Sequence, residues 1–266
     1  MPSRRAGLLA AASLTWLLLA PSFSLAAAEP AGMVLIPGGE YLRGRAFPWS
    51  DYEVAWYPNP VKDDSPARKI TVNAFWLDEA EVTNRRYAAF VKSAGHRAPY
   101  HWRDGQMPEA KSNYPAHNVS WDDAVAFCAW DGGKRLPTEA EWERAARGDE
   151  EGKIYPWGDR DITAKDAVFN QIDGPQPVCG KGRPGALCDM IGTVWEWCSD
   201  WYGQKYYASA PAANPLGPAE GQYRSLRGGS WFDVPPLFLT IPYRSWARPG
   251  ERSPTIGLRC AKSLTP

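Results

Sequence analysis

The sequence predicts an α+β fold: one compact domain with little regular secondary structure. Its 266 residues include 24 glycines and 25 prolines, well above average usage, so turns interrupt the chain every few residues. It also carries 14 tryptophans and 12 tyrosines, and 44% of its residues are hydrophobic. So many aromatic residues can bury enough apolar surface to offset the ordering entropy, which argues against disorder, and the frequent turns argue against a helical bundle.

Three capped segments in the middle of the chain predict helices. Thr83 can cap a helix that stops at Gly95, and Ser120 opens a second one. The run Thr138–Glu141 is a capping box, in which threonine and glutamate satisfy each other's free amides, and Gly148 ends that helix. The apolar residues expected to share helix faces are Tyr87, Phe90, Val91, Ala94, Ala124, Phe127, Cys128, Trp142, Ala145 and Ala146.

Short runs rich in β-branched and aromatic residues predict strands on both sides of these helices. The candidates are 33–36, 69–77, 225–227 and 258–261. Helix signals almost vanish beyond Arg147, and no low-complexity linker divides the chain. We therefore expect one domain over residues 29–266.

The first 28 residues resemble a secretory signal peptide. Arg4 and Arg5 precede an uncharged run over 6–20, which Pro21 ends, and three alanines at 26–28 suit cleavage. An apolar run of roughly 15 residues is shorter than the ~20 needed to span a bilayer. A periplasmic or secreted protein without membrane association after cleavage is therefore expected, by the general or the twin-arginine route.

Charge and cysteine usage argue against nucleic-acid binding and zinc binding, and in favour of disulfides. The 30 basic and 30 acidic side chains leave no net charge at pH 7, so electrostatics give no case for nucleic-acid binding. An oxidising compartment would favour disulfides, and the odd cysteine count leaves one thiol over. No C-x-x-C pair and no nearby histidine supports zinc. The five cysteines are Cys128, Cys179, Cys188, Cys198 and Cys260.

Seven short motifs follow one another along the mature chain. They are Met33–Gly39, Phe75–Asn84, Asn118–Ala124, Lys134–Trp142, Val194–Trp197, Arg227–Trp231 and Ile256–Arg259. In this order they resemble the formylglycine-generating enzyme (sulfatase-modifying factor) family over the whole mature chain. The resemblance implies a single α+β domain related to C-type lectins.

The chain departs from this family at the copper site. The founding enzymes oxidise a substrate cysteine to formylglycine with copper held by two cysteines, three and eight residues after the serine of the Gly-Gly-Ser motif. Counted from Ser230, these positions are Asp233 and Phe238. Cuprous copper needs thiolate ligands, and no cysteine lies between Cys198 and Cys260. A member without the founding activity is therefore expected, with a formylglycine-generating oxidase of atypical site as an alternative.

The resemblance brings in two other metals, iron and calcium. A related branch, the sulfoxide synthases of thiol-histidine biosynthesis, binds iron through histidines of an extra helical domain that is lacking here. The histidines of this chain, His96, His101 and His117, are interpreted as surface or hydrogen-bonded side chains. Calcium is better supported, because the resemblance implies a loop of hard oxygen donors. Its ligands would be Asp189, Gly192, Val194 and Glu196; alternatively, Asp189 makes a turn and Glu196 pairs with an arginine.

The resemblance also implies a disulfide between Cys128 and Cys260, because relatives of this type carry cysteines at matching positions. Cys128 lies on the inward face of its predicted helix, and Cys260 follows the motif that packs against that helix in the family. Cys179 and Cys188 could close a second, short loop, which leaves Cys198 as the odd thiol. Alternatively, Cys128 is a small buried hydrophobic residue.

The former copper cleft is the expected functional site. The candidate catalytic residues are Ser230, Asp233 and Arg244, and the candidate substrate-binding residues are Trp231, Phe238 and Trp246. We expect an exported maturation or accessory factor that acts on an exported client protein or a peptide-like small molecule. If it is an enzyme, it is expected to be an oxidoreductase with an unknown redox cofactor; the rival hypothesis is a noncatalytic, lectin-like binding module. The sequence leaves the oligomeric state open.

Overall fold

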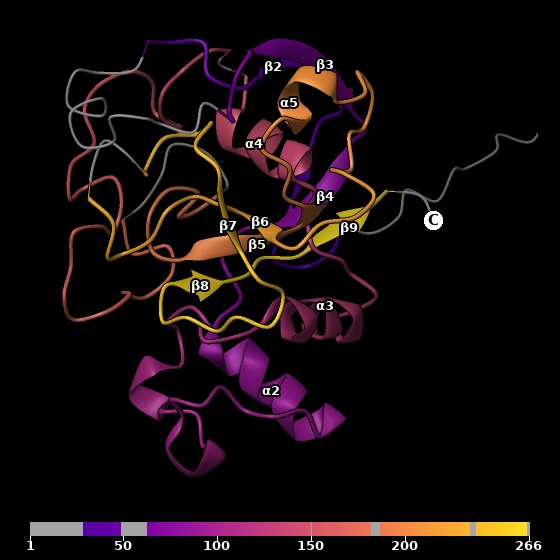
Figure 1. Cartoon of the computed structure of the whole chain (residues 1–266). Helices are drawn as coiled ribbons and strands as arrows, with labels where there is room; N and C mark the ends of the chain where they lie inside the picture. The colour runs from indigo at the N-terminus through magenta and orange to yellow at the C-terminus, as the bar shows by residue number, and fades with distance from the viewer. Residues whose placement is uncertain (1–28, 49–62, 150, 182–186, 235–237, 265–266) are drawn as a thin grey trace, which may run out of the picture.

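The computed structural model describes residues 29–48, 63–149, 151–181, 187–234 and 238–264 (Figure 1). The predicted signal peptide lies outside the described residues. Within them, long loops join short helices and strands, as the glycine and proline content predicts. No helix of these ranges has the length and hydrophobicity needed to cross a membrane.

Two small antiparallel sheets are built mainly from the N-terminal strands. Strand β1 (Met33–Ile36) pairs with β4 (Phe75–Asp78), which pairs on its other edge with β9 (Ala261–Ser263). Strand β2 (Gly39–Arg43) pairs with β3 (Arg68–Val72). The first sheet therefore joins the N-terminal part of the domain to its C-terminal end, whereas the second pairs consecutive strands.

The prediction of one strand over 69–77 was wrong, because this segment divides between the two sheets. β3 ends at Val72 and β4 begins at Phe75. Gly38, between β1 and β2, lies against this break: a Cβ atom on it would be 2.6 Å from the backbone nitrogen of Ala74. Both chain segments thus change sheets at one point, where only glycine fits.

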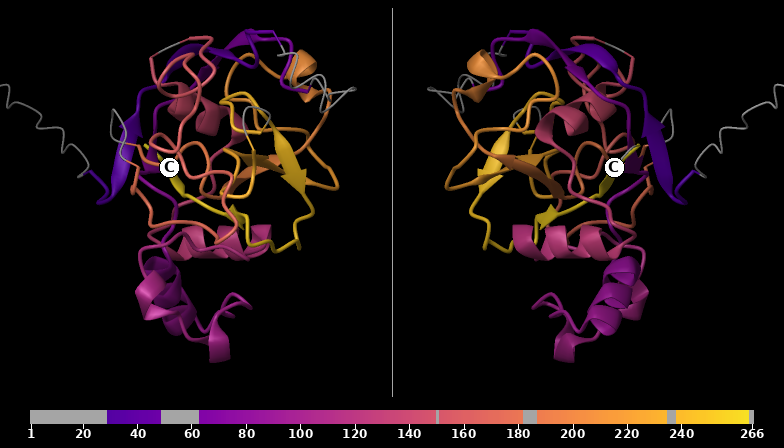
Figure 2. Two further views of the ribbon diagram at one scale, coloured as in Figure 1. Left: turned by 90° about the vertical axis from the view of Figure 1, so that its left-hand side faces the viewer. Right: turned by 90° about the vertical axis from the view of Figure 1, so that its right-hand side faces the viewer.

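The three predicted helices are confirmed, with their caps. Helix α2 (Asn84–Ala94) follows the N-cap Thr83, and Gly95 ends it in the left-handed conformation, with φ of 63°. Helices α3 (Trp121–Trp130) and α4 (Glu139–Arg147) both begin with a complete capping box. Short 3-10 turns at Arg103–Gly105 and Glu109–Lys111, and the one-turn α5 (Tyr206–Ser209), were not predicted. Helices α2 and α3 lie together at one end of the molecule, whereas α4 packs near β2 and β3 (Figures 1 and 2).

The largest sheet lies in the C-terminal half, in the order β7, β6, β5, β8. Strand β5 (Trp195–Trp201) pairs antiparallel with β6 (Arg224–Arg227) and parallel with β8 (Ile256–Gly257), and β7 (Ser245–Ala247) covers the other edge of β6. The predicted strand at 225–227 is thus part of β6.

The predicted strand over 258–261 was wrong, because this stretch is the crossover from β8 to β9. Isolated backbone hydrogen bonds, not a strand ladder, hold this stretch to other segments. Val82 donates to the carbonyl of Leu258, and Asp78 donates to that of Cys260. Between them, the Arg259 side chain turns into the core and is fully buried. The chain therefore leaves one sheet and enters the next within three residues.

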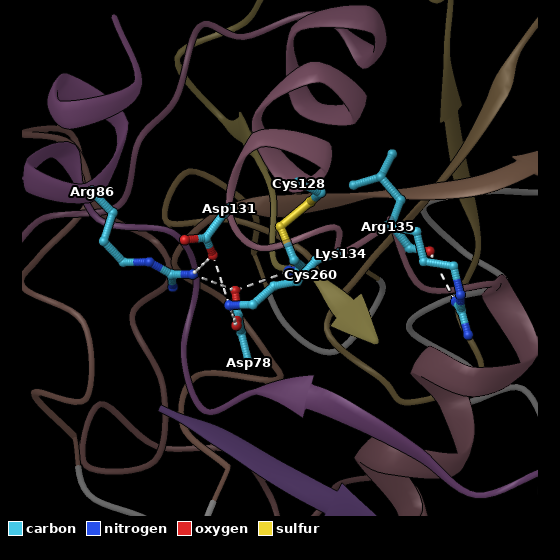
Figure 3. Close-up of a disulfide and its surroundings, with 8 residues drawn as sticks. Asp78, Arg86, Cys128, Asp131, Lys134, Arg135 and Cys260 are labelled. Carbon is cyan, nitrogen blue, oxygen red and sulfur yellow. Dashed lines mark hydrogen bonds and ion pairs between the residues drawn. A yellow bond between two sulfur atoms is a disulfide. The ribbon is translucent and has the colours of Figure 1, made fainter. Parts of the chain in front are cut away.

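Two disulfides fasten this fold. Cys128 of α3 bonds Cys260 beside β9, with the Cα atoms 5.6 Å apart (Figure 3). Cys179 bonds Cys188 across a short loop, and Cys198 is a free, buried thiol. These are the pairings expected from the sequence.

Beside the first disulfide, four charged side chains form a ring of alternating charge (Figure 3). Arg86 contacts Asp78 at 3.0 Å and Asp131 at 2.6 Å, and Lys134 contacts the same two carboxylates at 2.9 and 2.7 Å. Asp78 also accepts a hydrogen bond from the backbone of Cys260. The ring ties α2 and α3 to β4, next to the disulfide.

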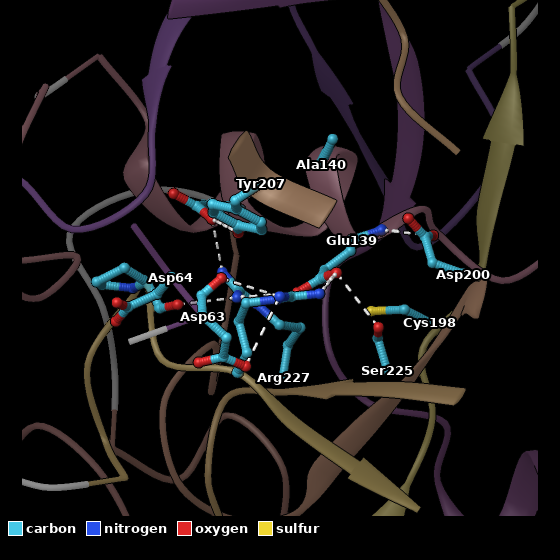
Figure 4. Close-up of polar contacts among 12 residues, drawn as sticks. Asp63, Asp64, Glu139, Ala140, Cys198, Asp200, Tyr207, Ser225 and Arg227 are labelled. Carbon is cyan, nitrogen blue, oxygen red and sulfur yellow. Dashed lines mark hydrogen bonds and ion pairs between the residues drawn. The ribbon is translucent and has the colours of Figure 1, made fainter. Parts of the chain in front are cut away.

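A second group of charges, the arginine cluster, is buried in the core around α4 (Figure 4). Its members are Arg43, Arg147, Arg227, Arg244, Glu139 and Glu143. Burial opposes ionisation of the two glutamates, but the arginines dominate and lower the pKa of each to about 2. The cluster is therefore an ionised framework that joins α4 to β2, β6 and β7.

Candidate functional site

The Gly-Gly-Ser loop leaves β6 through two left-handed glycines. Gly228 and Gly229 have φ of 99° and 79°. A Cβ atom on Gly229 would lie 2.5 Å from the side chain of Leu239 and 3.0 Å from the carbonyl oxygen of Phe238. Both the conformation and the space therefore require glycine before Ser230.

Ser230 and Asp233 lie together and form a closed turn. Asp233 Oδ2 accepts hydrogen bonds from the backbone nitrogen and the hydroxyl of Ser230, at 2.8 and 2.6 Å. The Ser230 hydroxyl in turn accepts from the backbone of Phe232. Burial raises the pKa of Asp233, and the bonds from Ser230 oppose that rise. The carboxylate is thus engaged by its own loop and by the side chain of Trp195 on β5.

Arg244 does not line a cleft with Asp233, so this prediction needs correction. Its side chain is fully buried in the arginine cluster, where Nε and Nη2 donate to the two oxygens of Glu139 at 2.5 and 2.9 Å. It also donates to the backbone carbonyl of Asp63. With every bond directed into the core, Arg244 positions β7 and does not reach solvent.

The three aromatic candidates lie in different environments. Trp231 is half-buried, and its Nε1 donates to the carbonyl of Pro254. Phe238 is half-buried against the edge of Tyr243, as part of the core packing. Trp246, on β7, is 37% exposed and stacks on Tyr202 with ring centroids 4.4 Å apart. Of the three, only Trp231 borders a described pocket.

This pocket, here named the histidine pocket, has a volume of about 240 Å³ and brings together distant loops. Asn84 is the first residue of α2. Lys111 ends the second 3-10 turn, Tyr114 comes three residues later, and Trp231 belongs to the Gly-Gly-Ser loop. Figure 2 shows that the α2 end of the molecule projects away from the sheets. The lining residues are Asn84, His101, Pro108, Lys111, Tyr114, His117, Ile172, Asp173, Gly174, Pro175, Trp231 and Pro254.

A stacked pair of imidazoles forms one part of the pocket lining. The rings of His101 and His117 are 4.1 Å apart and nearly parallel, at 14°. Burial, helped by the charge of Lys111, lowers the pKa of His101 to about 4 and that of His117 to about 3. Both imidazoles are therefore neutral at pH 7.

One amide group holds both imidazoles. Asn118 Nδ2 lies 3.1 Å from Nδ1 of His101 and 2.8 Å from Nδ1 of His117. With the amide placed this way, both Nδ1 atoms accept, so both rings carry their proton on Nε2. Asn118 can hold this position because it adopts a left-handed φ of 59°.

Exposed apolar side chains, here named the apolar rim, lie on the segments that carry the pocket. The segments 170–171 and 231–233 are joined by backbone bonds, from Asn170 to Asp233 and from Gln171 to Trp231. The rim residues and their exposed fractions are Tyr100 66%, Ile172 88%, Phe232 62% and Val234 43%. Of these residues, Ile172 also lines the pocket, and exposed apolar side chains near a pocket with a few convergent polar groups are typical of a binding site.

The predicted calcium loop contains more negative than positive charge. Glu196 is buried, and Arg259 donates to both of its oxygens at 2.7 Å, which is the arginine pairing that the sequence left open. Asp189 accepts from the backbone of Cys179 at 2.5 Å. Glu81 is also buried here, and neither of its oxygens has a hydrogen-bond partner among the described residues.

Burial is the main cause that raises the pKa of all three carboxyl groups, and the neighbouring carboxylates add to it for Glu81 and Glu196. Glu81 has Arg259 as an ion-pair partner at 4.0 Å, so three carboxyl groups lie near one arginine. Hard oxygen donors of this kind suit calcium, but Glu196 has both oxygens engaged by Arg259, so calcium in this loop stays a prediction. It would be held by Asp189 and Glu196 with carbonyls of Gly192 and Val194.

Sequence reasoning missed the histidine pocket. His101 and His117 were interpreted as hydrogen-bonded side chains, which they are, but not as neighbours. They are 16 positions apart in a loop region without periodicity, so no spacing rule joins them. The available signal was Asn118, which begins one of the seven motifs and holds both rings.

Comparisons with known proteins agree with this architecture. The model of the sulfatase-modifying factor enzyme 1-like domain matches residues 21–264. The formylglycine-generating enzyme of Streptomyces coelicolor is 34% identical over 302 residues, which cover 89% of this chain and 93% of that protein. The inactive C-alpha-formylglycine-generating enzyme 2 of Mus musculus is 29% identical over 310 residues, 94% of this chain and 92% of that protein. The structure of PvdO from Pseudomonas aeruginosa shares the fold, with a TM-score of 0.70 and 24% identity over 87% of this chain and 94% of that one. The chain belongs to the sulfatase-modifying factor (formylglycine-generating enzyme) family.

Proposed function

We propose that this protein is an exported maturation or accessory factor, periplasmic or secreted, that acts on a peptide segment of an exported client or on a peptide-like small molecule. The observation that carries the proposal is the histidine pocket. It presents hydrogen-bond donors and acceptors side by side, as a peptide requires, and it borders the Gly-Gly-Ser loop through Trp231. The apolar rim offers exposed surface for the rest of a polypeptide.

Copper-dependent oxidation of cysteine is not the proposed chemistry. The two positions that carry the copper thiolates in the founding enzymes hold Asp233 and Phe238. The free thiol of Cys198 is no substitute, because it is fully buried and burial raises its pKa well above the ordinary value. If the protein catalyses a redox step, the redox group must be a different one, and the histidine pocket is where the substrate would meet it.

Calcium is proposed as a structural ion. Asp189 and Glu196 would bind it with the carbonyl groups of Gly192 and Val194, close to the buried Glu81, whose oxygens have no hydrogen-bond partner among the described residues. The ion would supply positive charge and no redox chemistry. Its contribution would be to fix the loop that leads into β5.

A deletion and complementation experiment in the source organism tests the proposed function. Intact masses of exported proteins and peptides are compared between the wild type, the deletion strain and strains complemented with Phe232→Ser or Leu35→Ser. Phe232 lies on the apolar rim, whereas Leu35 is an exposed apolar residue of β1 that serves as the matched control. We expect one client to change in mass on deletion, and Leu35→Ser but not Phe232→Ser to restore it.

Two further outcomes separate the alternatives. A client that binds the purified protein but has the same mass in all strains would support the noncatalytic binding module and overturn the maturation role. A cysteine peptide incubated with the protein, cuprous copper and oxygen tests the founding reaction. We expect the peptide to remain unchanged, and its conversion to the aldehyde would establish an atypical formylglycine-generating site.

A further inference from the structure

We propose that the histidine pocket is a subsite for an acidic side chain, so that the peptide recognised by this protein carries an aspartate or glutamate there. The inference rests on the proposed function, in that it names the chemistry of the segment to be bound. It depends on three features of the pocket: an unneutralised ammonium group, two imidazole N–H donors, and an orphaned amide oxygen.

Lys111 supplies the positive charge. It is exposed, lies over the ring of Tyr114 with Nζ 5.5 Å from the centroid, and lines the pocket. No carboxylate among the described residues lies within ion-pair distance of its ammonium group. Its charge nevertheless reaches both imidazoles, since it lowers the pKa of each. An anion placed between Lys111 and the rings would find this charge available.

The imidazoles add directed donors. Because Asn118 Nδ2 faces both Nδ1 atoms, both Nε2 atoms carry hydrogen and can donate to a carboxylate. A metal ion shared by the two rings is a poor alternative. Each imidazole ligates in its own plane, and two parallel rings 4.1 Å apart cannot direct their in-plane lone pairs at a single ion. The pair is therefore suited to donate hydrogen bonds to the oxygen atoms of a carboxylate and not to bind a cation.

The acceptors explain why the ligand is a peptide and not a free anion. Asn84 is 1% exposed and lines the pocket, yet its Oδ1 has no hydrogen-bond partner in the described part of the chain. Its Nδ2 is already used, because it donates to the carbonyl of Lys111. Asp173, exposed on the same pocket, is a second acceptor, and its negative charge would keep the acidic side chain on the side of Lys111 and the imidazoles. A backbone N–H beside the acidic side chain would satisfy one of them.

The size of the pocket agrees with one side chain. Its volume of about 240 Å³ is below the ~300–1,000 Å³ typical of sites that enclose a drug-sized ligand. The remainder of the peptide would then lie on the apolar rim, whose three most exposed members are Ile172, Tyr100 and Phe232.

Matched capped tripeptides test the proposal by calorimetry with the full mature protein at pH 7 and low salt. Their central residue is glutamate, glutamine or tyrosine, between two alanines. A charge-assisted hydrogen bond predicts that the glutamate peptide binds about tenfold more tightly than the glutamine peptide. Lys111→Gln should abolish this preference. Lys92→Gln, an exposed lysine of α2 outside the pocket lining, should preserve it.

A second readout distinguishes contact from a remote charge effect. In nuclear magnetic resonance titrations, the bound glutamate peptide should raise the pKa of His101 and His117, because an anion beside them offsets Lys111. Equal affinity for glutamate and glutamine, tighter binding of the tyrosine peptide, or unchanged imidazole titration would each overturn the acidic subsite. None of these results changes the client-mass comparison between strains, so the proposed function can survive when the acidic subsite fails.

Discussion

Replacement of Glu139 by glutamine tests whether the arginine cluster holds the fold together. Glu139 is 1% exposed and is the first residue of α4. It binds Arg244 through both oxygens, Arg227 at 3.3 Å and Arg43 at 3.5 Å. Glutamine keeps the shape of the side chain but removes the charge that compensates three buried guanidinium groups. The variant therefore alters the balance of charge and replaces one accepting oxygen with an NH2 group that cannot accept from the arginines.

The expected loss follows from that imbalance. Breaking a buried ion pair from one side typically costs about 3–5 kcal/mol, because it leaves charge uncompensated in the core. For a domain of this size, each kcal/mol corresponds to roughly 2–4 °C in Tm. Glu139→Gln should therefore lower Tm by roughly 6–20 °C, measured by calorimetry or by circular dichroism during heating.

The pH dependence gives an independent check on the cause. The pKa of Glu139 is lowered to about 2 in the folded state from an ordinary value near 4.5. The stability it contributes is thus complete above pH 4.5 and is lost as pH falls towards 2, and the variant should lack this part of the acid response. Glu40→Gln, which removes an exposed partner of Lys69, is the matched control and should leave Tm unchanged. A Tm for Glu139→Gln as high as that of the control would refute the reasoning.

Three further predictions concern the calcium loop, the disulfide and the histidine pocket. Chelation should lower Tm, and Asp189→Asn should remove that response; identical melting curves with and without chelator would contradict the site. Cys128→Ala with Cys260→Ala should lower the free energy of unfolding by about 2–5 kcal/mol in denaturant titrations, since the bond closes a loop with a sequence separation of 132. Burial lowers the pKa of His101 and His117 to about 4 and 3, so the folded chain binds fewer protons than the unfolded chain below pH 6.5. Stability should therefore fall as pH drops from 6.5 towards 4, and the double variant His101→Gln, His117→Gln should flatten that slope; an unchanged slope would contradict it.

Local signals predicted the helices because the information lies within a few residues. Thr83 and Gly95 mark the ends of α2, and the Thr138–Glu141 box marks the start of α4. Strand boundaries failed where the chain changes sheets. At Gly38 and at Arg259 the change depends on contacts with distant segments, to Ala74 and to Glu196, that no local pattern encodes.

The same difference between local signals and distant contacts applies to the candidate site. The Gly-Gly-Ser motif located the loop, and the Ser230–Asp233 contact follows from a separation of three residues. Arg244 was assigned to the same cleft, but its partner Glu139 is 105 positions away. A buried guanidinium and a substrate-binding one have the same sequence signature, and only packing distinguishes them.

The way in which Asp233 is engaged explains how the scaffold can persist without copper chemistry. Its carboxylate closes the turn by accepting both polar groups of Ser230, and its backbone carbonyl accepts from Asn170, which joins the loop to the apolar rim. The loop is thus held by hydrogen bonds that need no metal ligand. Because Asp233 is used in this way, it is a poor general base, and the groups left free to act on a ligand are those of the neighbouring pocket: Lys111 and the two imidazoles. The loop therefore keeps its shape with Asp233 at this position, and the proposed recognition would depend on side chains adjacent to it.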